Sequence, residues 1–327
     1  MFNEEKGCMG KGKYMAESIV KVENLVKRYK EILALDHLNL DIKEGEIFGL
    51  LGPNGSGKTT TIYSILGLLK YDKGTIEVFG KAINSDATET KNQIGVVMQN
   101  VAVFEELNVY ENIDYFCGLY IQDKKKRRTY VEEAIAFVGL EEYKKMRPAK
   151  LSGGLIRRLN IACGIAHKPR LIFMDEPTVA VDPQSRNKIL EGIQELNRQG
   201  ATIVYTSHYM EEVEQICSRI AIMDHGKMLA IGTKETLKKM IKMGETITVE
   251  NIKLEEEDIY HIKELEDVYQ VSYENHIVVV KFTKSNQSLV KLLTYFHHNK
   301  IVFGQVSTQL PTLNDVFLEI TGKALRD

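Results

Sequence analysis

The chain has 327 residues, of which 43% are hydrophobic and 27% charged, enough apolar material for one large globular domain and a smaller one. Its net charge of −2 gives no basic excess, so the composition offers no support for a nucleic-acid partner. No uncharged apolar run approaches the roughly 20 residues of a membrane-spanning helix, and the 4 scattered cysteines favour reduced thiols in a cytoplasmic protein.

The N-terminal residues carry no pattern of a folded element. Residues 1–17 mix charges with glycine and have no apolar core, so they do not form a secretory signal, and we expect a disordered extension there. Met15 is an alternative start to Met1. From Ser18 to Val26, and more strictly from Leu38 to Ile42, apolar and polar residues alternate with the period of a strand.

The next elements alternate between strand and helix. Ile47 to Leu51 is apolar apart from its glycine, as expected of a buried parallel strand, and helical spacing follows from Thr59 to Leu69. Further buried strands are predicted at 94–98, 171–174, 202–206 and 220–223, and helices at 109–120, 129–138, 154–166, 185–198 and 210–217. This order predicts an α/β fold with a mainly parallel sheet and a helix-rich insert at about 108–168.

The residue composition and the secondary-structure pattern change after Gly232. Residues 233–243 are predicted to form a short polar helix, and the chain from Glu245 onward is acidic and rich in strand patterns. Strands are expected at 246–249 and 277–282, and a helix at 288–298. We therefore predict a main domain at 18–238 and a small C-terminal α+β domain at 239–327.

A glycine-rich loop follows the strand that ends at Leu51. The pattern G-x-x-x-x-G-K-[ST] is met there, and its glycines allow backbone N–H groups to surround phosphate oxygens. The lysine reaches the β and γ phosphates and the threonine hydroxyl ligates Mg²⁺. The motif predicts an ATP site formed by Gly52, Pro53, Asn54, Gly55, Ser56, Gly57, Lys58, Thr59 and Thr60.

Two carboxylates end the strand predicted at 171–174. Asp175 would hold Mg²⁺, directly or through water, and Glu176 would polarise the attacking water as a general base. An Asp-Glu pair after a strand is, by itself, more often a solvated strand end. The phosphate loop earlier in the chain favours the catalytic interpretation here.

Leu151-Ser152-Gly153-Gly154 lies just before that acidic strand. With it, the chain resembles the ATP-binding cassette (ABC) ATPases from Ile19 to Gly232, and the motifs follow the order of the family. The resemblance implies the P-loop NTPase fold of ABC nucleotide-binding domains, with a helical subdomain. It also implies that Ser152, Gly153 and Gly154 close over ATP held by another subunit, so that a second copy or a paralogue completes the site.

Four further positions match the family. Gln99 resembles the glutamine that touches Mg²⁺ and the attacking water, and His208 resembles the histidine at the γ-phosphate. Asp182 resembles a residue of the loop that crosses the dimer interface. Tyr29 resembles the aromatic residue that stacks on adenine, although an isolated tyrosine is often a packing residue. Two positions depart from the pattern: Leu155 replaces a frequent glutamine, and Ala180 a frequent glycine.

The C-terminal run 311–322 resembles the ending of the drug- and antibiotic-resistance exporter ATPases of the ABC-2 type, and it also fits an amphipathic helix. The resemblance implies an ATPase subunit at the inner face of the membrane that powers a separate membrane permease. The segment 104–112 resembles the surface that receives a helix of that permease, and the basic run 124–128 is expected to be a solvated helix end. An alternative is a soluble ABC ATPase that acts without a membrane partner. A regulatory module that binds ATP without turnover is disfavoured by Glu176 and His208.

Overall fold

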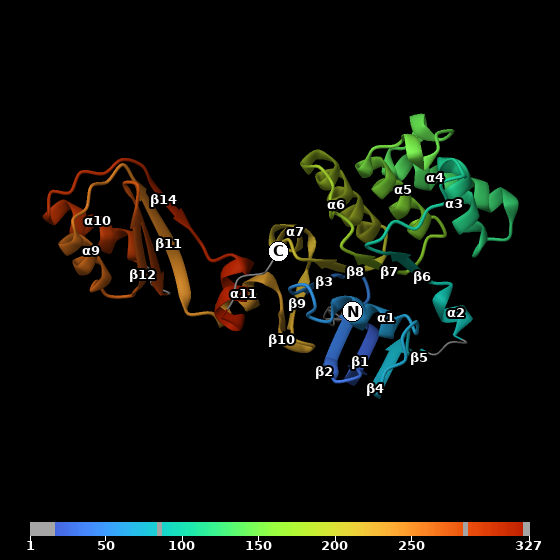
Figure 1. The fold of residues 1–327 in the computed structure, drawn as a ribbon, viewed down its shortest axis with the longest axis horizontal. Helices are drawn as coiled ribbons and strands as arrows, with labels where there is room; N and C mark the ends of the chain where they lie inside the picture. The colour runs from blue at the N-terminus through green and yellow to red at the C-terminus, as the bar shows by residue number, and fades with distance from the viewer. Residues whose placement is uncertain (1–16, 84–86, 284–286, 323–327) are drawn as a thin grey trace, which may run out of the picture. The chain divides into compact units, whose positions relative to one another are not determined.

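The computed structural model describes residues 17–83, 87–283 and 287–322. Their contacts form two compact units, one of residues 1–47 with 60–204 and one of 48–59 with 205–327 (Figure 1). Met15, Cys8 and nearly all of the expected N-terminal extension lie outside the described residues. Within the described ranges, no helix is both long and apolar enough to cross a membrane.

The first unit opens with an antiparallel sheet. Its strands are paired in the order β2-β1-β4-β5, and the buried positions of β2 alternate as the sequence pattern predicted. The two long strands extend well beyond the alternating runs. The strands are β1 (Ser18–Tyr29), β2 (Ile32–Lys43), β4 (Lys73–Val78) and β5 (Lys81–Ala82).

A group of packed helices follows in the same unit, and no strand interrupts the described chain between 98 and 170. Polar side chains cap several N-termini, including Asn108, Asp123, Ser152 and Asp182. The helices are α2 (Thr88–Lys91), α3 (Val109–Gly118), α4 (Lys124–Val138), α5 (Gly153–Ile165) and α6 (Pro183–Arg198), with short 3-10 turns η1 (Glu141–Tyr143) and η2 (Pro148–Lys150).

A second sheet has the strand order β10-β9-β3-β8-β7-β6. The pairs β6–β7 and β3–β9 are parallel, and β9–β10 is antiparallel. β3, β7 and β8 are buried along their whole length, which explains their continuous apolar runs. The strands are β3 (Ile47–Leu51), β6 (Ile94–Val97), β7 (Leu171–Asp175), β8 (Thr202–Ser207), β9 (Arg219–Asp224) and β10 (Lys227–Gly232).

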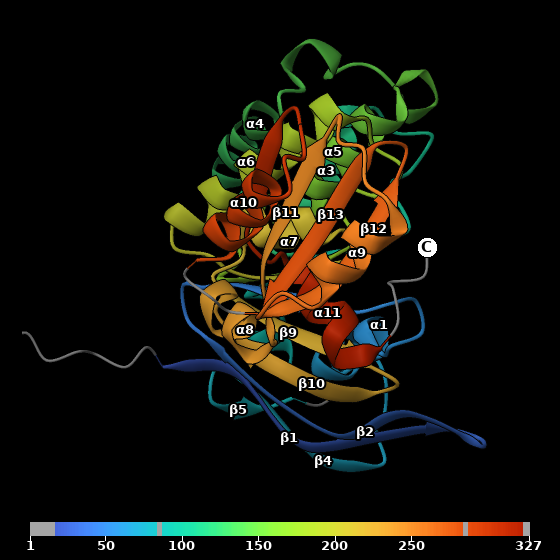
Figure 2. The ribbon, with the colours of Figure 1, turned by 90° about the vertical axis from the view of Figure 1, so that its left-hand side faces the viewer.

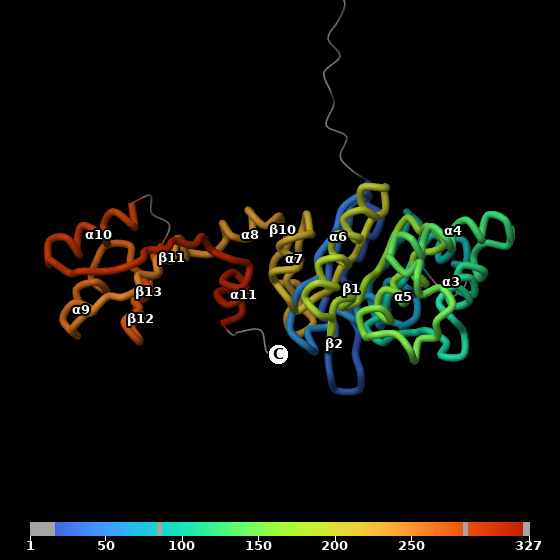
Figure 3. Tube along the Cα trace, turned by 90° about the horizontal axis from the view of Figure 1, so that it is seen from above, coloured from blue at the N-terminus to red at the C-terminus, as the bar shows by residue number. Residues whose placement is uncertain are grey.

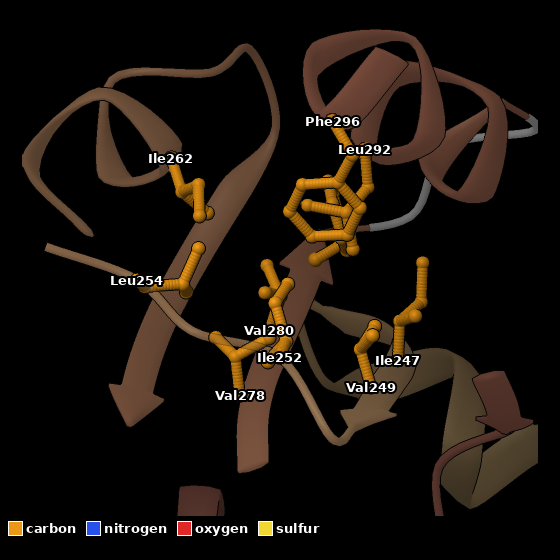
Figure 4. Packing of buried hydrophobic residues seen from close by; sticks show 10 residues of the cluster. Ile247, Val249, Ile252, Leu254, Ile262, Val278, Val280, Leu292 and Phe296 are labelled. Atoms are coloured by element: carbon orange, nitrogen blue, oxygen red, sulfur yellow. The ribbon is translucent and has the colours of Figure 1, made fainter. Parts of the chain in front are cut away.

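The C-terminal part of the second unit is an antiparallel sheet with two helices on one face (Figures 2 and 3). Side chains of β11, β13, α9 and α10 form its own hydrophobic core, with Phe296 and Leu292 pointing from α10 toward the sheet (Figure 4). The elements are β11 (Met243–Glu250), α9 (Glu256–Lys263), β12 (Val268–Glu274), β13 (Ile277–Thr283), α10 (Ser288–His298) and β14 (Val306–Gln309).

Three further helices lie in the second unit: α7 (Met210–Ile216), α8 (Lys234–Met240) and α11 (Leu313–Thr321). Helix α1 (Lys58–Ile65) begins in the second unit and belongs to the first unit from Thr60 onward. The helix predicted at 233–243 ends earlier, because Ile241 is extended and Met243, the first residue of β11, pairs with Thr283 of β13. The predicted amphipathic helix near the C-terminus is α11, whose Leu313, Val316 and Phe317 are buried.

Candidate functional site

The glycine-rich loop joins strand β3 to helix α1. β3 pairs in parallel with β9, which fixes the point at which the loop begins. Gly55 and Gly57 have φ of +81° and +107°, a region that favours glycine. A Cβ atom on Gly52 would lie 2.4 Å from the backbone oxygen of Met223. The three glycines are therefore required by the shape of the loop itself.

The loop closes around its own lysine. The buried ammonium of Lys58 donates hydrogen bonds to the carbonyl oxygens of Gly52, at 2.7 Å, and Pro53, at 3.2 Å. The Ser56 hydroxyl is buried and has no hydrogen-bond partner among the described residues. Thr59 and Thr60 lie in the first turn of α1. An inward lysine and an unpaired buried hydroxyl suit an anionic ligand that accepts hydrogen bonds.

His208 follows strand β8 in the same unit, and a buried carboxylate shapes its loop. Glu212 accepts hydrogen bonds from the hydroxyls of Tyr205, at 2.7 Å, and Ser207, at 2.9 Å. The Ser207 oxygen in turn accepts from the backbone N–H of Tyr209 at 2.9 Å. The ring of His208 lies against that of Tyr209, with centroids 4.1 Å apart. The residues before and after His208, Ser207 and Tyr209, are therefore both fixed by hydrogen bonds.

In the first unit, the acidic pair lies at the carboxyl end of β7. Asp175 and Glu176 are only 2% and 6% exposed. Gln99, which follows β6, donates from Nε2 to Oε2 of Glu176 at 3.2 Å. Because β6 and β7 pair in parallel, their carboxyl ends meet at the same sheet edge. The structure therefore brings together two residues that the sequence placed 77 positions apart.

The segment after β7 contains backbone in the left-handed region. Glu176 has φ of +47° and Ala180 has φ of +59°. This region is unfavourable for residues with a Cβ atom, by about 1–2 kcal/mol. It gives a physical reason for the frequent glycine at the position of Ala180, and this chain adopts the same conformation without it.

The Ser-Gly-Gly motif begins helix α5. The Ser152 hydroxyl accepts from the backbone N–H of Leu155 at 3.4 Å, and Ser152 and Gly153 are exposed. Gly154 is buried, and a Cβ atom there would lie 2.9 Å from Ser185 Oγ and 3.4 Å from Asp182 Oδ2. Only a glycine lets the start of α5 approach the start of α6 so closely.

Asp182 is the N-cap of α6 and lies beside the Ser-Gly-Gly motif. Its Oδ1 accepts from the backbone N–H of Ser185 at 2.9 Å. Hydrogen bonds from the backbone and then the side chain of Ser185 hold the pKa of Asp182 below its ordinary value. Asp182 is therefore a fixed negative charge at neutral pH.

Tyr29 ends strand β1 and is 45% exposed, with Lys27 Nζ 4.9 Å from the ring centroid. An exposed ring face is compatible with stacking on adenine, and the role of Tyr29 stays a prediction. The departure Leu155 is partly buried and leaves the Ser152 cap intact.

Three buried polar residues on helices, which support these loops, were not predicted from the sequence. Glu212 supports the His208 loop, and Arg157 and Asn160 bond the backbone around Gln99. Their only sequence signal is a polar residue on the apolar face of a predicted helix, where burial demands a hydrogen-bond partner.

Comparisons with known proteins agree with these motifs. The family model described as ABC transporter matches residues 35–179. The chain is 39% identical to the linearmycin resistance ATP-binding protein LnrL of Bacillus subtilis (strain 168), over 94% of this chain and 100% of that protein. It is 31% identical to the daunorubicin resistance ATP-binding protein DrrA3 of Streptomyces coeruleorubidus, over 94% and 97%.

Among solved structures, the chain is similar to the dimeric post-hydrolysis state of the ATP-binding cassette MJ0796 bound to ADP and Pi. The sequence identity is 30% and the TM-score 0.61, and the match covers 65% of this chain and 98% of that one. The P-loop α/β fold predicted from the sequence is confirmed. The chain belongs to the ABC transporter family and is an ATP-binding subunit with ATPase activity.

Proposed function

We propose that this chain hydrolyses ATP to drive export through a membrane permease that is a separate polypeptide. The observation that carries the proposal is the end-to-end match, at 39% identity, to a resistance ATP-binding protein. A second relative, the Nod factor export ATP-binding protein I of Burkholderia orbicola (strain AU 1054), is 35% identical over 68% of this chain and 73% of its own length. The first name refers to resistance and the second to export, which supports the exporter assignment.

In this proposal the chain's residues divide the chemistry among them. Lys58 and the loop N–H groups hold the phosphates, and Glu176 accepts the proton of the attacking water. Gln99 orients that water from its contact with Glu176, and His208 contacts the γ-phosphate. Tyr29 stacks on the adenine.

The Mg²⁺ ion that accompanies ATP would neutralise phosphate charge. Among the described residues, no three His, Cys, Asp or Glu side chains gather to hold a metal ion. Proteins bind Mg²⁺ through one or two carboxylates together with substrate phosphates, and the buried Asp175 carboxylate fits that role. The ligands would be the Thr59 hydroxyl, the Asp175 carboxylate and the Gln99 amide oxygen, because the Gln99 nitrogen already contacts Glu176.

We also propose that two copies of this chain form the working ATPase. The exposed start of α5 at Ser152 and Gly153 directs N–H groups and the positive end of a helix outward, where they can meet an anion held by another molecule. Gly154 and Asp182 lie beside it. The similar cassette MJ0796 is dimeric, which supports this arrangement.

The permease contact is proposed at the segment after Gln99. Phe104 and Tyr115 are 42% and 48% exposed, with ring centroids 4.9 Å apart, and Glu105 and Glu106 are exposed beside them. Such a patch suits an amphipathic helix with a basic edge. The inner membrane face is then the proposed location, with residues 18–238 as the ATPase domain, 108–168 as its helical subdomain and 239–327 as an accessory domain.

The ATPase roles are tested with Glu176→Gln and Lys58→Ala. Glu176→Gln should keep ATP binding, lose nearly all turnover and give an ATP-dependent dimer in light scattering. Lys58→Ala should weaken nucleotide affinity. Glu191→Gln, at an exposed position on α6, is the control and should behave as wild type. Wild-type turnover in Glu176→Gln would reject the base assignment.

The proposed association with a membrane permease needs a separate test. The tagged chain is co-expressed with a multi-helix membrane protein encoded beside it and purified in detergent. We expect the two proteins to co-purify and turnover to change on their association. Recovery of the chain alone, with unchanged turnover, would instead favour an ATPase that acts without a membrane partner.

A further inference from the structure

Arg157 is a buried charged residue on helix α5, only 4% exposed. A guanidinium group carries five N–H donors in one plane. In this chain the group donates to 5 backbone carbonyl oxygens, all of them in the same unit. The acceptors belong to two short segments, Met98–Gln99 and Asp175–Pro177.

The distances show which carbonyls are held most closely. Nε donates to Pro177 O at 2.6 Å, and Nη2 donates to Glu176 O at 2.6 Å and Asp175 O at 3.4 Å. Nη1 donates to Gln99 O at 2.7 Å and Met98 O at 3.0 Å. One side chain therefore ties the ends of two neighbouring strands, β6 and β7, to helix α5.

These carbonyls belong to the residues whose side chains meet. Gln99 Nε2 lies 3.2 Å from Glu176 Oε2, and Glu176 has φ of +47°. A left-handed backbone persists at a residue with a Cβ atom only where its surroundings over-determine it. Three successive carbonyls bonded to one rigid group supply that restraint at Glu176.

We propose that Arg157 is a positioning residue for ATP hydrolysis, which sets the Gln99 and Glu176 side chains relative to each other through their backbone carbonyls. This rests on the proposed role of Glu176 as the general base. A lysine cannot replace it, because an ammonium group is a point charge without the planar fork.

The neighbouring Arg158 provides a matched control. Its Nη1 donates to Val138 O at 2.9 Å and Gly139 O at 3.3 Å, at the end of helix α4. It is the same residue type on the same helix, and it too bonds backbone carbonyls. Neither of these acceptors belongs to the segments around Gln99 or Glu176, so the loss of Arg158 reports on stability alone.

The experiment compares Arg157→Lys, Arg157→Met and Arg158→Met. We measure kcat, nucleotide affinity from a fluorescent ATP analogue, and the unfolding midpoint. Both Arg157 variants should lose about 10- to 100-fold in kcat, the size expected when reacting groups are displaced by about 1 Å. Their nucleotide affinity should stay within about threefold, because the phosphate loop is untouched. Arg158→Met should keep its kcat within about threefold of the wild-type value, even if its unfolding midpoint falls as much as those of the Arg157 variants.

Two results separate this inference from the proposed function. If Arg157→Lys retains the kcat of Arg158→Met at equal stability, the positioning role is overturned while Glu176 can still be the base. If Arg157→Met fails to fold, the kcat of Arg157→Lys tests the positioning role. A double variant, Arg157→Lys with Glu176→Gln, is then also measured. That double variant should still form the ATP-dependent dimer, and failure to dimerise would assign Arg157 to the dimer contact instead. Wild-type turnover in Glu176→Gln would reject the assignment of Glu176 as the general base, on which this inference rests.

Discussion

His167 should make the stability of this chain depend on pH in the weakly acidic range. The ring is 7% exposed, donates from Nε2 to Ile94 O at 3.1 Å and stacks on Tyr120 with centroids 3.9 Å apart. Burial lowers the pKa of His167 from 6.5 to about 4, and the bond to the Ile94 carbonyl opposes this only in part. The folded state therefore holds the neutral ring.

The sign follows from this depressed pKa. As the pH falls below 6.5, the unfolded chain binds the proton and the folded chain does not, so stability is lost down to about pH 4. Lowering the pKa of His167 from 6.5 to about 4 corresponds to about 3 kcal/mol. Between pH 7 and pH 5 the loss from this residue is about 2 kcal/mol.

The measurement is urea unfolding of wild type and His167→Phe at pH 7 and pH 5. Phenylalanine keeps a ring against Tyr120 and removes the titrating group. It also removes the donor to Ile94, which lowers stability equally at both pH values. The variant should therefore lose about 2 kcal/mol less than wild type on acidification. His298→Gln, at an exposed position, is the control. Equal losses in His167→Phe and wild type would refute the reasoning.

Three further substitutions test other parts of the chain. Gly52→Ala should abolish nucleotide binding in a fluorescence titration, because its Cβ would meet a backbone oxygen at 2.4 Å; wild-type affinity would contradict the loop geometry. Phe296→Ala, at a fully buried position, should cost about 3–5 kcal/mol in denaturant unfolding, against little for the exposed Val290→Ala on the same helix. Glu212→Leu should lower kcat by about tenfold or more by releasing the His208 loop, with nucleotide affinity nearly unchanged; an unaltered kcat would show that the loop holds without it.

Short-range patterns predicted most of the elements. β3, β7 and β8 were predictable because strands buried on both faces read as apolar runs. Helix α4 starts at Lys124, five residues before the apolar spacing begins, because Asp123 caps it through the N–H groups of Lys125 and Lys126. The basic run is thus the first turn of a helix, as expected of a solvated helix end.

Buried charged residues that bond to groups on other elements were not predictable in the same way. Glu212 and Arg157 both lie on helices whose apolar spacing is clear, and each interrupts it with a charge. The reason for the charge is a set of acceptors or donors that only the folded chain brings near, such as the Glu176 carbonyl. The family resemblance names Gln99 and Glu176, yet it does not say what fixes their contact.

The segment from Glu176 to Ala180 connects these observations. Both ends have a left-handed backbone at residues with a Cβ atom, which opposes folding by about 1–2 kcal/mol each. The local bonds, Val179 N to Glu176 O at 3.4 Å and Val181 N to Thr178 O at 3.3 Å, are long and do not offset that cost by themselves. The bonds from Arg157 lie on the N-terminal side of the segment, and the Asp182 cap lies on the other. Since both come from helices that begin at the proposed nucleotide contacts, the conformation of Glu176, the proposed general base, depends on how those two helix ends are held.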